Sequence, residues 1–285
     1  MIPQEFNYSR PKTLQDATDL LAANDAKILA GGMSLIPLMK LRLSTPEHLV
    51  DLGTVSDLNY ITEKSGAIHI GALTTHHQVE TSDLLKTKCP LLVETASHIG
   101  DSQVRNMGTL GGSTAHADPA ADYPAALFAL EAEVRMVRKD SEQLLPIDDF
   151  FVDSLTTALE PEEIISELVF PVENPRNTFA YQKLRQPASG FAIVGVAVRI
   201  RMTEGKIDMV RIGVTGLGPK AFRATNVEEL LYGSCCTPKD INTASALVDE
   251  GIEANTDLHA SSNYRRHMAR IYTARALTAA LERTT

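Results

Sequence analysis

The first 54 residues alternate between short apolar runs and helical patterns. Apolar positions in residues 13–23 lie on one face of a helix that a threonine can cap. Residues 26–30 form a short apolar run that stops at a pair of glycines, and helical spacing returns in residues 34–43. Residues 48–52 favour a second buried strand. The order strand, glycine turn, helix, strand predicts a small parallel βαβ unit.

From residue 54 onward the pattern changes to a larger unit of strands and short helices. Apolar runs and period-two alternation predict strands at 58–61, 67–73, 133–138 and 163–170, and helices at 79–85, 91–99 and 123–130. Residues 109–115 contain a second glycine pair and are predicted to form a turn. Pro171, Pro175 and the polar residues between them favour a domain boundary between residues 175 and 176.

The C-terminal part places strands first and helices afterwards. Strands are predicted at 180–184, 192–201 and 209–215, with a turn at Glu204 and Gly205. Helical patterns follow at 224–232, 238–254 and 264–282. This order predicts an α+β domain.

Composition narrows the class of protein. The 285 residues are 44% hydrophobic and 22% charged, which is typical of a globular chain of two domains. The net charge of −9 and the lack of a basic run argue against nucleic-acid binding. No apolar run is long enough to span a membrane, and the N-terminus lacks a signal-peptide pattern. Cys89, Cys235 and Cys236 cannot form a disulfide framework, so we expect a protein of the reducing cytoplasm. They form no C-x-x-C motif, so we expect no zinc or iron–sulfur site in this chain.

Two glycine segments are the best candidates for ligand binding. In residues 30–37, AGGMSLIP, glycines after a strand let a ligand approach the backbone, a helix start offers free N–H groups, and Ser34 adds a hydroxyl. An ordinary strand-to-helix turn would have the same residues. Residues 109–116, TLGGSTAH, repeat the pattern, and neither segment contains Lys or Arg. A pyrophosphate bound there would be held by backbone amides and hydroxyls.

Other motifs are better explained by structure than by function. The string GLGPKA resembles a dinucleotide fingerprint, but its proline removes an N–H group and no βαβ unit surrounds it. Neither a Walker sequence nor a G-x-S-x-G elbow occurs. Several side chains beside turns lack the spacing of a metal site, namely His76, His77, His116, Asp118 and Asp122. Either aspartate of the DPAAD segment would cap a helix or accept hydrogen bonds from ligand hydroxyls.

Taken together, several segments resemble one known family. They are AGGMSLIPLMKLRL, GALTTH, IGDSQVRNMGTLGGSTAHADPAADYPAAL and YQKLRQPASGFAIVGVAV. The sequence is similar to the FAD-binding medium subunits of molybdenum hydroxylases, the group of carbon monoxide, xanthine and nicotine dehydrogenases. This resemblance extends from about residue 6 to the final helix.

The fold that the resemblance implies is α+β. A PCMH-type (vanillyl-alcohol-oxidase-like) FAD-binding domain would occupy residues 1–175, divided at about residue 54 into a small βαβ subdomain and a larger one. A C-terminal domain would occupy residues 176–285, with a three-stranded antiparallel sheet and helices.

The resemblance also implies which residues bind FAD. The first glycine segment would wrap around the pyrophosphate and the second would form its other side. Asp122, with Asp118 as the weaker candidate, would bind FAD hydroxyls, Lys183 would contact the flavin, and Phe191 would lie beside the isoalloxazine ring. The full set is Leu29, Ala30, Gly31, Gly32, Met33, Ser34, Leu35, Ile36, Thr75, Ile99, Thr109, Leu110, Gly111, Gly112, Ser113, Asp118, Asp122, Ile165, Lys183 and Phe191.

Three positions depart from the family pattern. Met33 occupies a position where relatives often have Gln or His, and Phe191 one where Tyr or Trp is common. Gly190 replaces an expected Asp. These differences affect flavin potential or acceptor choice rather than FAD binding itself.

By the same resemblance, the chain would pass electrons through FAD. A large subunit with the molybdenum cofactor would hydroxylate the substrate, and [2Fe–2S] clusters on a small subunit would deliver electrons to FAD in this chain. The implied assembly is a dimer of heterotrimers, and this chain would contain no catalytic residue and no metal ligand. The substrate stays open, as does the acceptor among oxygen, quinone, NAD and a carrier protein.

The sequence leaves two other functions open. A stand-alone PCMH-type flavin oxidoreductase acting on its own small substrate would need a general base beside the flavin, for which His76 and His116 are the candidates. A non-catalytic binding module would follow if the glycine segments were only turns. Bound FAD would exclude the module, and co-purifying molybdenum and iron–sulfur subunits would separate the first two functions.

Overall fold

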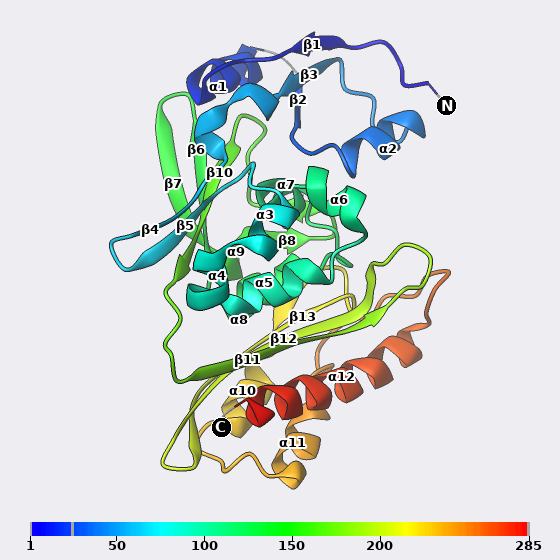
Figure 1. Cartoon of the computed structure of the whole chain (residues 1–285). Coiled ribbons are helices and arrows are strands. Elements are labelled where there is room, and N and C mark those ends of the chain that lie inside the picture. The colour runs from blue at the N-terminus through cyan, green and yellow to red at the C-terminus, as the bar shows by residue number, and fades with distance from the viewer. Residues whose placement is uncertain (1, 24–25, 284–285) are drawn as a thin grey trace.

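The computed structural model describes residues 2–23 and 26–283. Its elements form three regions: a small parallel sheet, a five-stranded sheet with short helices, and a C-terminal sheet with helices. The regions follow one another in space in the order in which they occur in the chain, from the blue end to the red end in Figure 1.

The N-terminal region contains the predicted βαβ unit and one strand that the pattern did not predict. Its strands are β1 (Asn7–Ser9), β2 (Ala26–Leu29) and β3 (His48–Asp51), in the order β1-β3-β2, and both pairings are parallel. The helices are α1 (Leu14–Ala23) and α2 (Leu35–Lys40). Helix α2 is shorter than the predicted range of 34–43, because Ser34 precedes it and Leu41 ends it.

The middle region is built on a five-stranded antiparallel sheet. Its order is β4 (Ile61–Lys64), β5 (Ala67–Gly71), β10 (Ile164–Pro171), β6 (Glu133–Arg138) and β7 (Ser141–Pro146). The predicted strand at 58–61 is wrong over most of its length, because Leu58 ends a short 3₁₀ turn, η2 (Ser56–Leu58). Leu58 is only 2% exposed, so its apolar character reflects burial in a turn rather than a strand.

Short helices cover this sheet. They are α3 (His76–Thr81), α4 (Asp83–Lys88), α5 (Pro90–Ser97), α6 (Ser102–Met107), α7 (Leu110–His116), α8 (Tyr123–Ala129) and α9 (Ile147–Phe150), with the small strands β8 (Phe151–Asp153) and β9 (Thr156–Thr157). The predicted helix at 79–85 is split at Ser82, whose side chain accepts a hydrogen bond from the Leu85 N–H and so starts α4. A second 3₁₀ turn, η1 (Leu52–Thr54), follows β3.

The predicted glycine turn at 109–115 is wrong, because these residues form helix α7. The Thr109 side chain caps the helix by accepting a hydrogen bond from the Gly112 N–H. A Cβ at Gly111 would lie 2.5 Å from the Cβ of Ala72, and the Gly111 N–H donates to the Ala72 carbonyl (2.9 Å). Glycine is therefore required here for the close packing of α7, not for a turn.

The C-terminal region is an antiparallel sheet with helices, as predicted. Three long strands, β11 (Asn177–Arg185), β12 (Ala192–Thr203) and β13 (Lys206–Thr215), are joined by β14 (Phe222–Arg223), a two-residue edge strand that was not expected. The helices are α10 (Thr225–Leu231), α11 (Pro238–Ser245) and α12 (Ser262–Glu282). Helix α11 ends well before residue 254, where the prediction placed its end.

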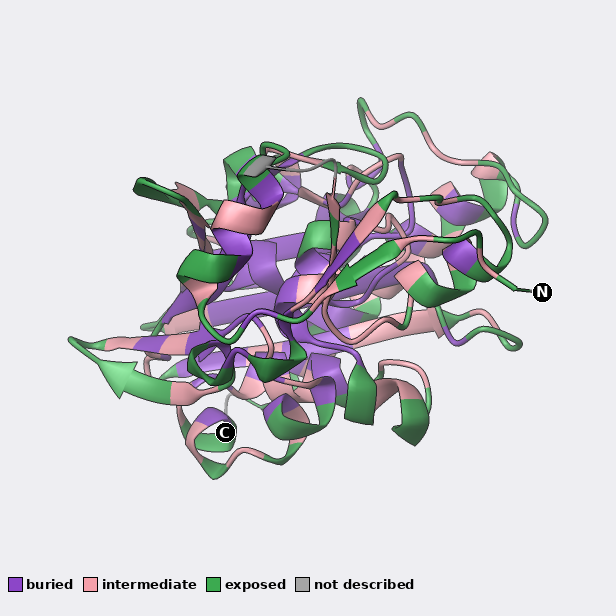
Figure 2. Cartoon of the chain, turned by 90° about the horizontal axis from the view of Figure 1, so that it is seen from above, coloured by how far each residue is buried: buried purple, intermediate pink, exposed green. Residues whose placement is uncertain are grey.

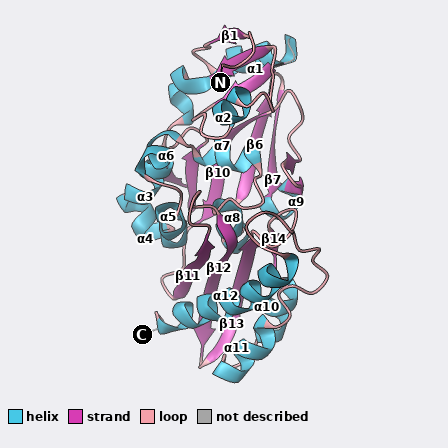
Figure 3. Ribbon diagram, turned by 90° about the vertical axis from the view of Figure 1, so that its right-hand side faces the viewer, coloured by secondary structure: helices cyan, strands magenta, loops and turns pink. Residues whose placement is uncertain are grey.

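The C-terminal sheet has a buried face on each side. Ala197 on β12 packs into the core of the middle region, whereas its neighbours Val196 and Val198 pack into a second core. Helix α8 lies so close to β13 that a Cβ at Gly213 would collide with the Ala125 carbonyl. Figure 3 shows α8 on one side of this sheet and α10, α11 and α12 on the other, and Figure 2 shows buried strands through the centre of the molecule. The middle and C-terminal regions are therefore joined by a continuous packed interface.

Candidate functional site

A cavity of about 320 Å³ lies between the N-terminal and middle regions. Several loops contribute to its wall: those after β2 and β3, the segment before α3, and the turn between α6 and α7. The lining residues are Ala30, Gly31, Gly53, Thr54, Val55, Ser56, Asn59, Leu73, Thr75, Asn106, Met107 and Thr109. Every polar side chain in this wall is a neutral hydroxyl or amide.

The loop after β2 provides unpaired backbone donors beside the cavity. Among the described residues, the N–H groups of Gly31, Gly32, Met33 and Ser34 donate no hydrogen bond. Gly32 has a φ of +70°, which is the left-handed region that favours glycine. The loop thus presents consecutive free N–H groups, an arrangement that binds anionic oxygens.

The opposite wall is formed by threonines that cap two helices. Thr75 caps α3 and Thr109 caps α7, and the two residues form an isolated antiparallel bridge. Hydrogen bonds from Leu110 to the Thr74 carbonyl (2.9 Å) and from His76 to the Gly108 carbonyl (3.0 Å) hold the two chain segments together. Within the described chain the Thr109 hydroxyl proton has no acceptor, so it is free for a ligand.

The two predicted glycine segments meet at this cavity. A Cβ at Gly31 would collide with the Met107 carbonyl and would lie 2.8 Å from the Cα of Gly108. A Cβ at Gly112 would lie 3.6 Å from the Cβ of Ala30. The loop after β2 and the start of α7 are therefore in van der Waals contact, although they are far apart in the sequence.

Predicted residues of the glycine segments fall into two groups. The cavity wall includes Ala30, Gly31, Thr75 and Thr109. The remaining ones belong to the same segments but are not among the lining residues; they are Leu29, Gly32, Met33, Ser34, Leu35, Ile36, Leu110, Gly111, Gly112 and Ser113.

A buried ionic cluster joins the start of α8 to strand β11. The Lys183 ammonium contacts both carboxylate oxygens of Asp122, at 2.8 and 2.9 Å, and the Tyr181 hydroxyl donates to the same carboxylate at 2.5 Å. The Lys183 ammonium also donates to the His98 carbonyl (3.0 Å). Burial raises the pKa of Asp122 and lowers the pKa of Lys183, and each partner's charge opposes these shifts.

The cluster includes Lys183, the residue predicted to contact the flavin. Its side chain is 1% exposed and its ammonium is fully engaged by Asp122 and the His98 carbonyl. In this structure the Lys183 ammonium is therefore engaged within the protein, and its contact with the flavin stays a prediction. Asp122 retains 5% exposure.

Other predicted residues lie away from the cavity wall. Phe191 is 43% exposed and follows Gly190, whose added Cβ would lie 3.6 Å from the Cα of Gly100. Ile99 is partly buried against the main core, and Ile165 on β10 belongs to that core with 5% exposure. The Asp118 side chain accepts a hydrogen bond from the Ala120 N–H and so stabilises the turn before α8.

Sequence reasoning missed the loop after β3. Gly53, Thr54, Val55 and Ser56 line the cavity, together with Asn59, Leu73, Asn106 and Met107. A usable signal was present, because ligands bind beyond the carboxyl ends of parallel strands. Strands β2 and β3 are parallel neighbours, so the loops that follow them had to lie side by side.

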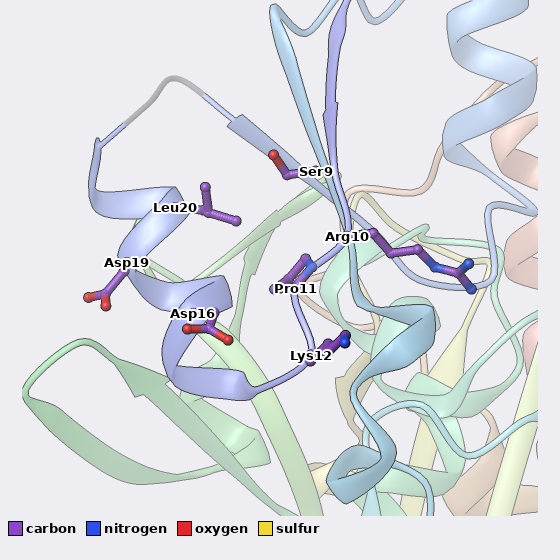
Figure 4. A pocket seen from close by; sticks show the side chains of 7 residues that line it. All are labelled: Ser9, Arg10, Pro11, Lys12, Asp16, Asp19 and Leu20. Carbon is purple, nitrogen blue, oxygen red and sulfur yellow. The ribbon is translucent and has the colours of Figure 1, made fainter.

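A second, more open depression near the N-terminus has no comparable geometry. Figure 4 shows Asp19 at one end and the guanidinium group of Arg10 at the other, so the charged groups do not converge on one point. No group of three His, Cys, Asp or Glu side chains in the described residues could hold a metal ion. Likewise, none of the helices in the described part of the chain has the length and apolarity to cross a membrane.

Comparison with protein families accounts for nearly all of the chain. Residues 4–173 match the FAD binding domain in molybdopterin dehydrogenase, and residues 179–280 match the CO dehydrogenase flavoprotein C-terminal domain. These matches confirm the predicted fold class and the FAD-binding domain.

Known proteins with the same organisation are similar over their full length. The carbon monoxide dehydrogenase medium chain of Hydrogenophaga pseudoflava is 36% identical, with 99% of each chain covered. The glyceraldehyde dehydrogenase medium chain of Sulfolobus acidocaldarius is 35% identical over 97% of this chain and 98% of that relative. A solved structure of carbon monoxide dehydrogenase from H. pseudoflava has a TM-score of 0.97 at 37% identity and covers 99% of both chains. The chain therefore belongs to the FAD-binding medium subunits of the molybdenum hydroxylase family, which are subunits of oxidoreductases.

Proposed function

We propose that this chain is the electron-transfer subunit of a molybdenum hydroxylase, passing electrons from [2Fe–2S] clusters of a partner subunit through FAD to an external acceptor. The observation that carries the proposal is the contact between Gly31 and the Met107–Gly108 backbone, which creates a cavity with neutral donors on both walls. FAD, when bound, supplies the redox chemistry, and the protein supplies binding, orientation and electrostatics.

The donor set fits a diphosphate. Free N–H groups at Gly31 to Ser34 and the free hydroxyl proton of Thr109 are the groups that would hold the phosphate oxygens. Helices α2, α3 and α7 begin near the cavity, so their positive dipole ends favour the negative charge of the phosphates. No charged side chain in the cavity wall competes for this role.

The flavin half of the cofactor would lie toward the C-terminal region. Asp122 is the candidate to bind FAD hydroxyls, and Phe191 the candidate to lie against the flavin ring, because its side chain is 43% exposed beside the loop at Gly100. Ile99 lies next to this loop and would contribute an apolar contact. Asp118 and Ile165 would then support the site from behind rather than touch the cofactor.

The assembly that we propose rests on the similarity to medium chains of multi-subunit complexes. The described residues contain no set of cysteine or histidine ligands for a cluster. We propose that the [2Fe–2S] clusters are on a small subunit and the molybdenum cofactor on a large one, in a cytoplasmic dimer of heterotrimers. We place the boundary between the FAD-binding domain and the C-terminal domain between residues 175 and 176, which lies between the two matched ranges.

The test is purification of the chain alone and with its partners. The isolated chain is expected to be yellow and to contain one FAD per chain, and a colourless chain that takes up no added FAD would contradict the proposal. Pull-down of the tagged chain from its native host is expected to recover molybdenum and [2Fe–2S] iron. Stoichiometric FAD without either metal would favour a stand-alone flavin oxidoreductase instead.

The structure argues against the alternative function, a stand-alone flavin oxidoreductase. That function needs a base beside the flavin, and His76 is 5% exposed, with burial lowering its pKa to about 4. Buried and facing Tyr123, His76 is not available to an external substrate. His116 is at the C-terminal end of α7, the end remote from the cavity-lining Thr109.

A further inference from the structure

Tyr181 occupies a special position between the two domains. It lies on β11, paired with Ala197 of β12, and its side chain is 1% exposed. Its backbone N–H donates to the Glu94 carboxylate of α5 (2.9 Å), and its ring packs edge-on against His98 at 5.5 Å between centroids. These contacts fix the direction of its hydroxyl, which donates to Asp122 at 2.5 Å.

The neighbouring strand leaves room for this hydroxyl. Gly195 on β12 is the register partner of Lys183 and lies diagonally across from Tyr181, and a Cβ at Gly195 would lie 2.5 Å from the tyrosine oxygen. The Tyr181 hydroxyl therefore occupies the space that a side chain at Gly195 would need.

The ionic cluster is not explained by stability alone. Burial pushes Asp122 and Lys183 toward their neutral forms, since it raises the pKa of the first and lowers the pKa of the second. A buried ion pair of this kind is often replaceable by apolar residues without loss of stability. Its polar groups are nevertheless all paired: the Tyr181 hydroxyl and the Lys183 ammonium both donate to the Asp122 carboxylate, and Lys183 also donates to the His98 carbonyl. His98 directly precedes Ile99 and Gly100 in the chain.

We propose that Tyr181 is a positioning residue of the FAD site: its hydroxyl holds the Asp122 carboxylate in its charged, Lys183-paired arrangement, so that one ionic unit drawn from both domains fixes the wall beside the flavin. This rests on the proposed function. Asp122 and the His98 carbonyl come from the FAD-binding domain, whereas Tyr181 and Lys183 come from the C-terminal domain. The hydroxyl thus couples the docking of the two domains to the shape of the cofactor site.

The charged surroundings determine the sign of the expected pH effect. Asp122 faces Tyr181 and Lys183 from β11 and His98 directly after α5, with Glu94 and Arg185 further out. The tyrosine hydroxyl lowers the pKa of Asp122 by donating to the charged form. Its removal therefore raises that pKa, and acid neutralises Asp122 and breaks the pair at a higher pH than in the wild type.

The experiment compares acid-induced FAD release in Tyr181→Phe and Tyr123→Phe, followed by FAD fluorescence in the full-length protein. The Tyr123 hydroxyl is equally buried and adjacent to Asp122 in sequence, yet no hydrogen-bond partner for it is present in the described chain, so Tyr123→Phe is a matched control. We expect Tyr181→Phe to move the release midpoint upward by about one pH unit, which is the effect of one lost hydrogen bond to a charged group. Tyr123→Phe should leave the midpoint unchanged.

Each outcome is decisive. Coincident profiles for wild type and Tyr181→Phe, or equal shifts in both variants, would overturn the role of Tyr181 while leaving the proposed function intact. A wild-type chain that binds no FAD would overturn both. If Tyr181→Phe does not fold, Gly195→Ala replaces it, because the added Cβ would lie 2.5 Å from the Tyr181 hydroxyl oxygen and displace it from Asp122. We expect the release midpoint to rise, and an unchanged midpoint would contradict the inference.

Discussion

Gly31 lies directly against Met107, so closely that any side chain at Gly31 would collide with the Met107 carbonyl. This contact brings the loop after β2 to the start of α7 and sets the width of the cavity between them. The contact also shows that glycine at position 31 is required for backbone packing as well as for ligand access. The backbone of one loop packs on the backbone of the other, and the free N–H groups next to the contact are held at the cavity wall.

Gly31→Ala should therefore weaken FAD binding. The added methyl group must move the loop or residues 107–108, because it meets backbone atoms rather than a flexible side chain. We expect a stability loss of about 1–3 kcal/mol, as for overpacking elsewhere, and at least a tenfold weaker affinity for FAD, which corresponds to about 1.4 kcal/mol. FAD content after gel filtration and the urea midpoint measure the two effects.

Gly66→Ala is the control for Gly31→Ala. Gly66 has a φ of +80° and no atom within 4 Å of its Cβ position, so alanine brings strain without a clash. A stability loss of about 1 kcal/mol with normal FAD content is expected. Wild-type FAD content in Gly31→Ala would show that the loop contact does not shape the site.

Thr109→Ala tests the second wall. The substitution removes the cap on the Gly112 N–H, worth about 1 kcal/mol of stability, and also removes the hydroxyl proton that faces the cavity. A hydrogen bond to a charged oxygen contributes about 1.5–3 kcal/mol, so FAD affinity should fall by about 10- to 100-fold. Titration of the apoprotein with FAD measures this loss.

Thr237→Ala separates capping from binding. Thr237 caps α11 through a capping box that resembles the one at Thr75, but α11 lies in the C-terminal region, away from the cavity. The variant should lose similar stability and keep full FAD affinity. Equal FAD affinity in both threonine variants would assign Thr109 to helix capping alone.

The strands were predictable where burial is continuous or strictly alternating. Residues 192–200 of β12 are buried on both faces, because α8 covers one side of the sheet and α12 the other. The result is an unbroken run of apolar residues and glycine over 192–198, which has few interpretations other than a central strand. By contrast, β7 is exposed along most of its length, so the sequence of residues 141–146 lacks an apolar signal.

The glycine segment at 109–115 shows where local reasoning fails. Two adjacent glycines lower helix propensity and predict a turn. The helix forms because the Thr109 cap and the contact of Gly111 with Ala72 stabilise it, and Ala72 belongs to a distant part of the chain. Pairing of the two glycine segments at a ligand site was nevertheless predictable in outline, since both carry free donors and no charge.

Phe191→Ala should alter the flavin more than the fold. The side chain is 43% exposed, so its removal should change stability by less than about 1 kcal/mol. If Phe191 lies beside the isoalloxazine ring, the substitution will change the visible spectrum and the midpoint potential of bound FAD, because solvent reaches the ring. Spectroelectrochemical titration measures both quantities.

Leu258→Ala is the control for Phe191→Ala. Leu258 is fully exposed, and its neighbour His259 lies 3.4 Å from Gln186 at the start of the loop that contains Phe191. Loss of this apolar side chain should leave spectrum and potential unchanged. An unaltered potential in Phe191→Ala would remove the residue from the flavin site.

His76 should make the protein less stable in mild acid. Burial lowers the pKa of His76 from 6.5 to about 4, and the unfolded chain binds a proton more readily than the folded one between these values. Stability from the neutral imidazole is therefore complete above pH 6.5 and is lost as the pH falls toward 4. The loss in the free energy of unfolding between pH 7 and pH 5 should be about 2 kcal/mol.

Urea unfolding with saturating FAD at both pH values measures this loss, and His76→Gln should remove most of the difference. His77→Gln, at an exposed neighbouring imidazole, should retain it, so an equal pH dependence in wild type and His76→Gln would exclude His76 as its source.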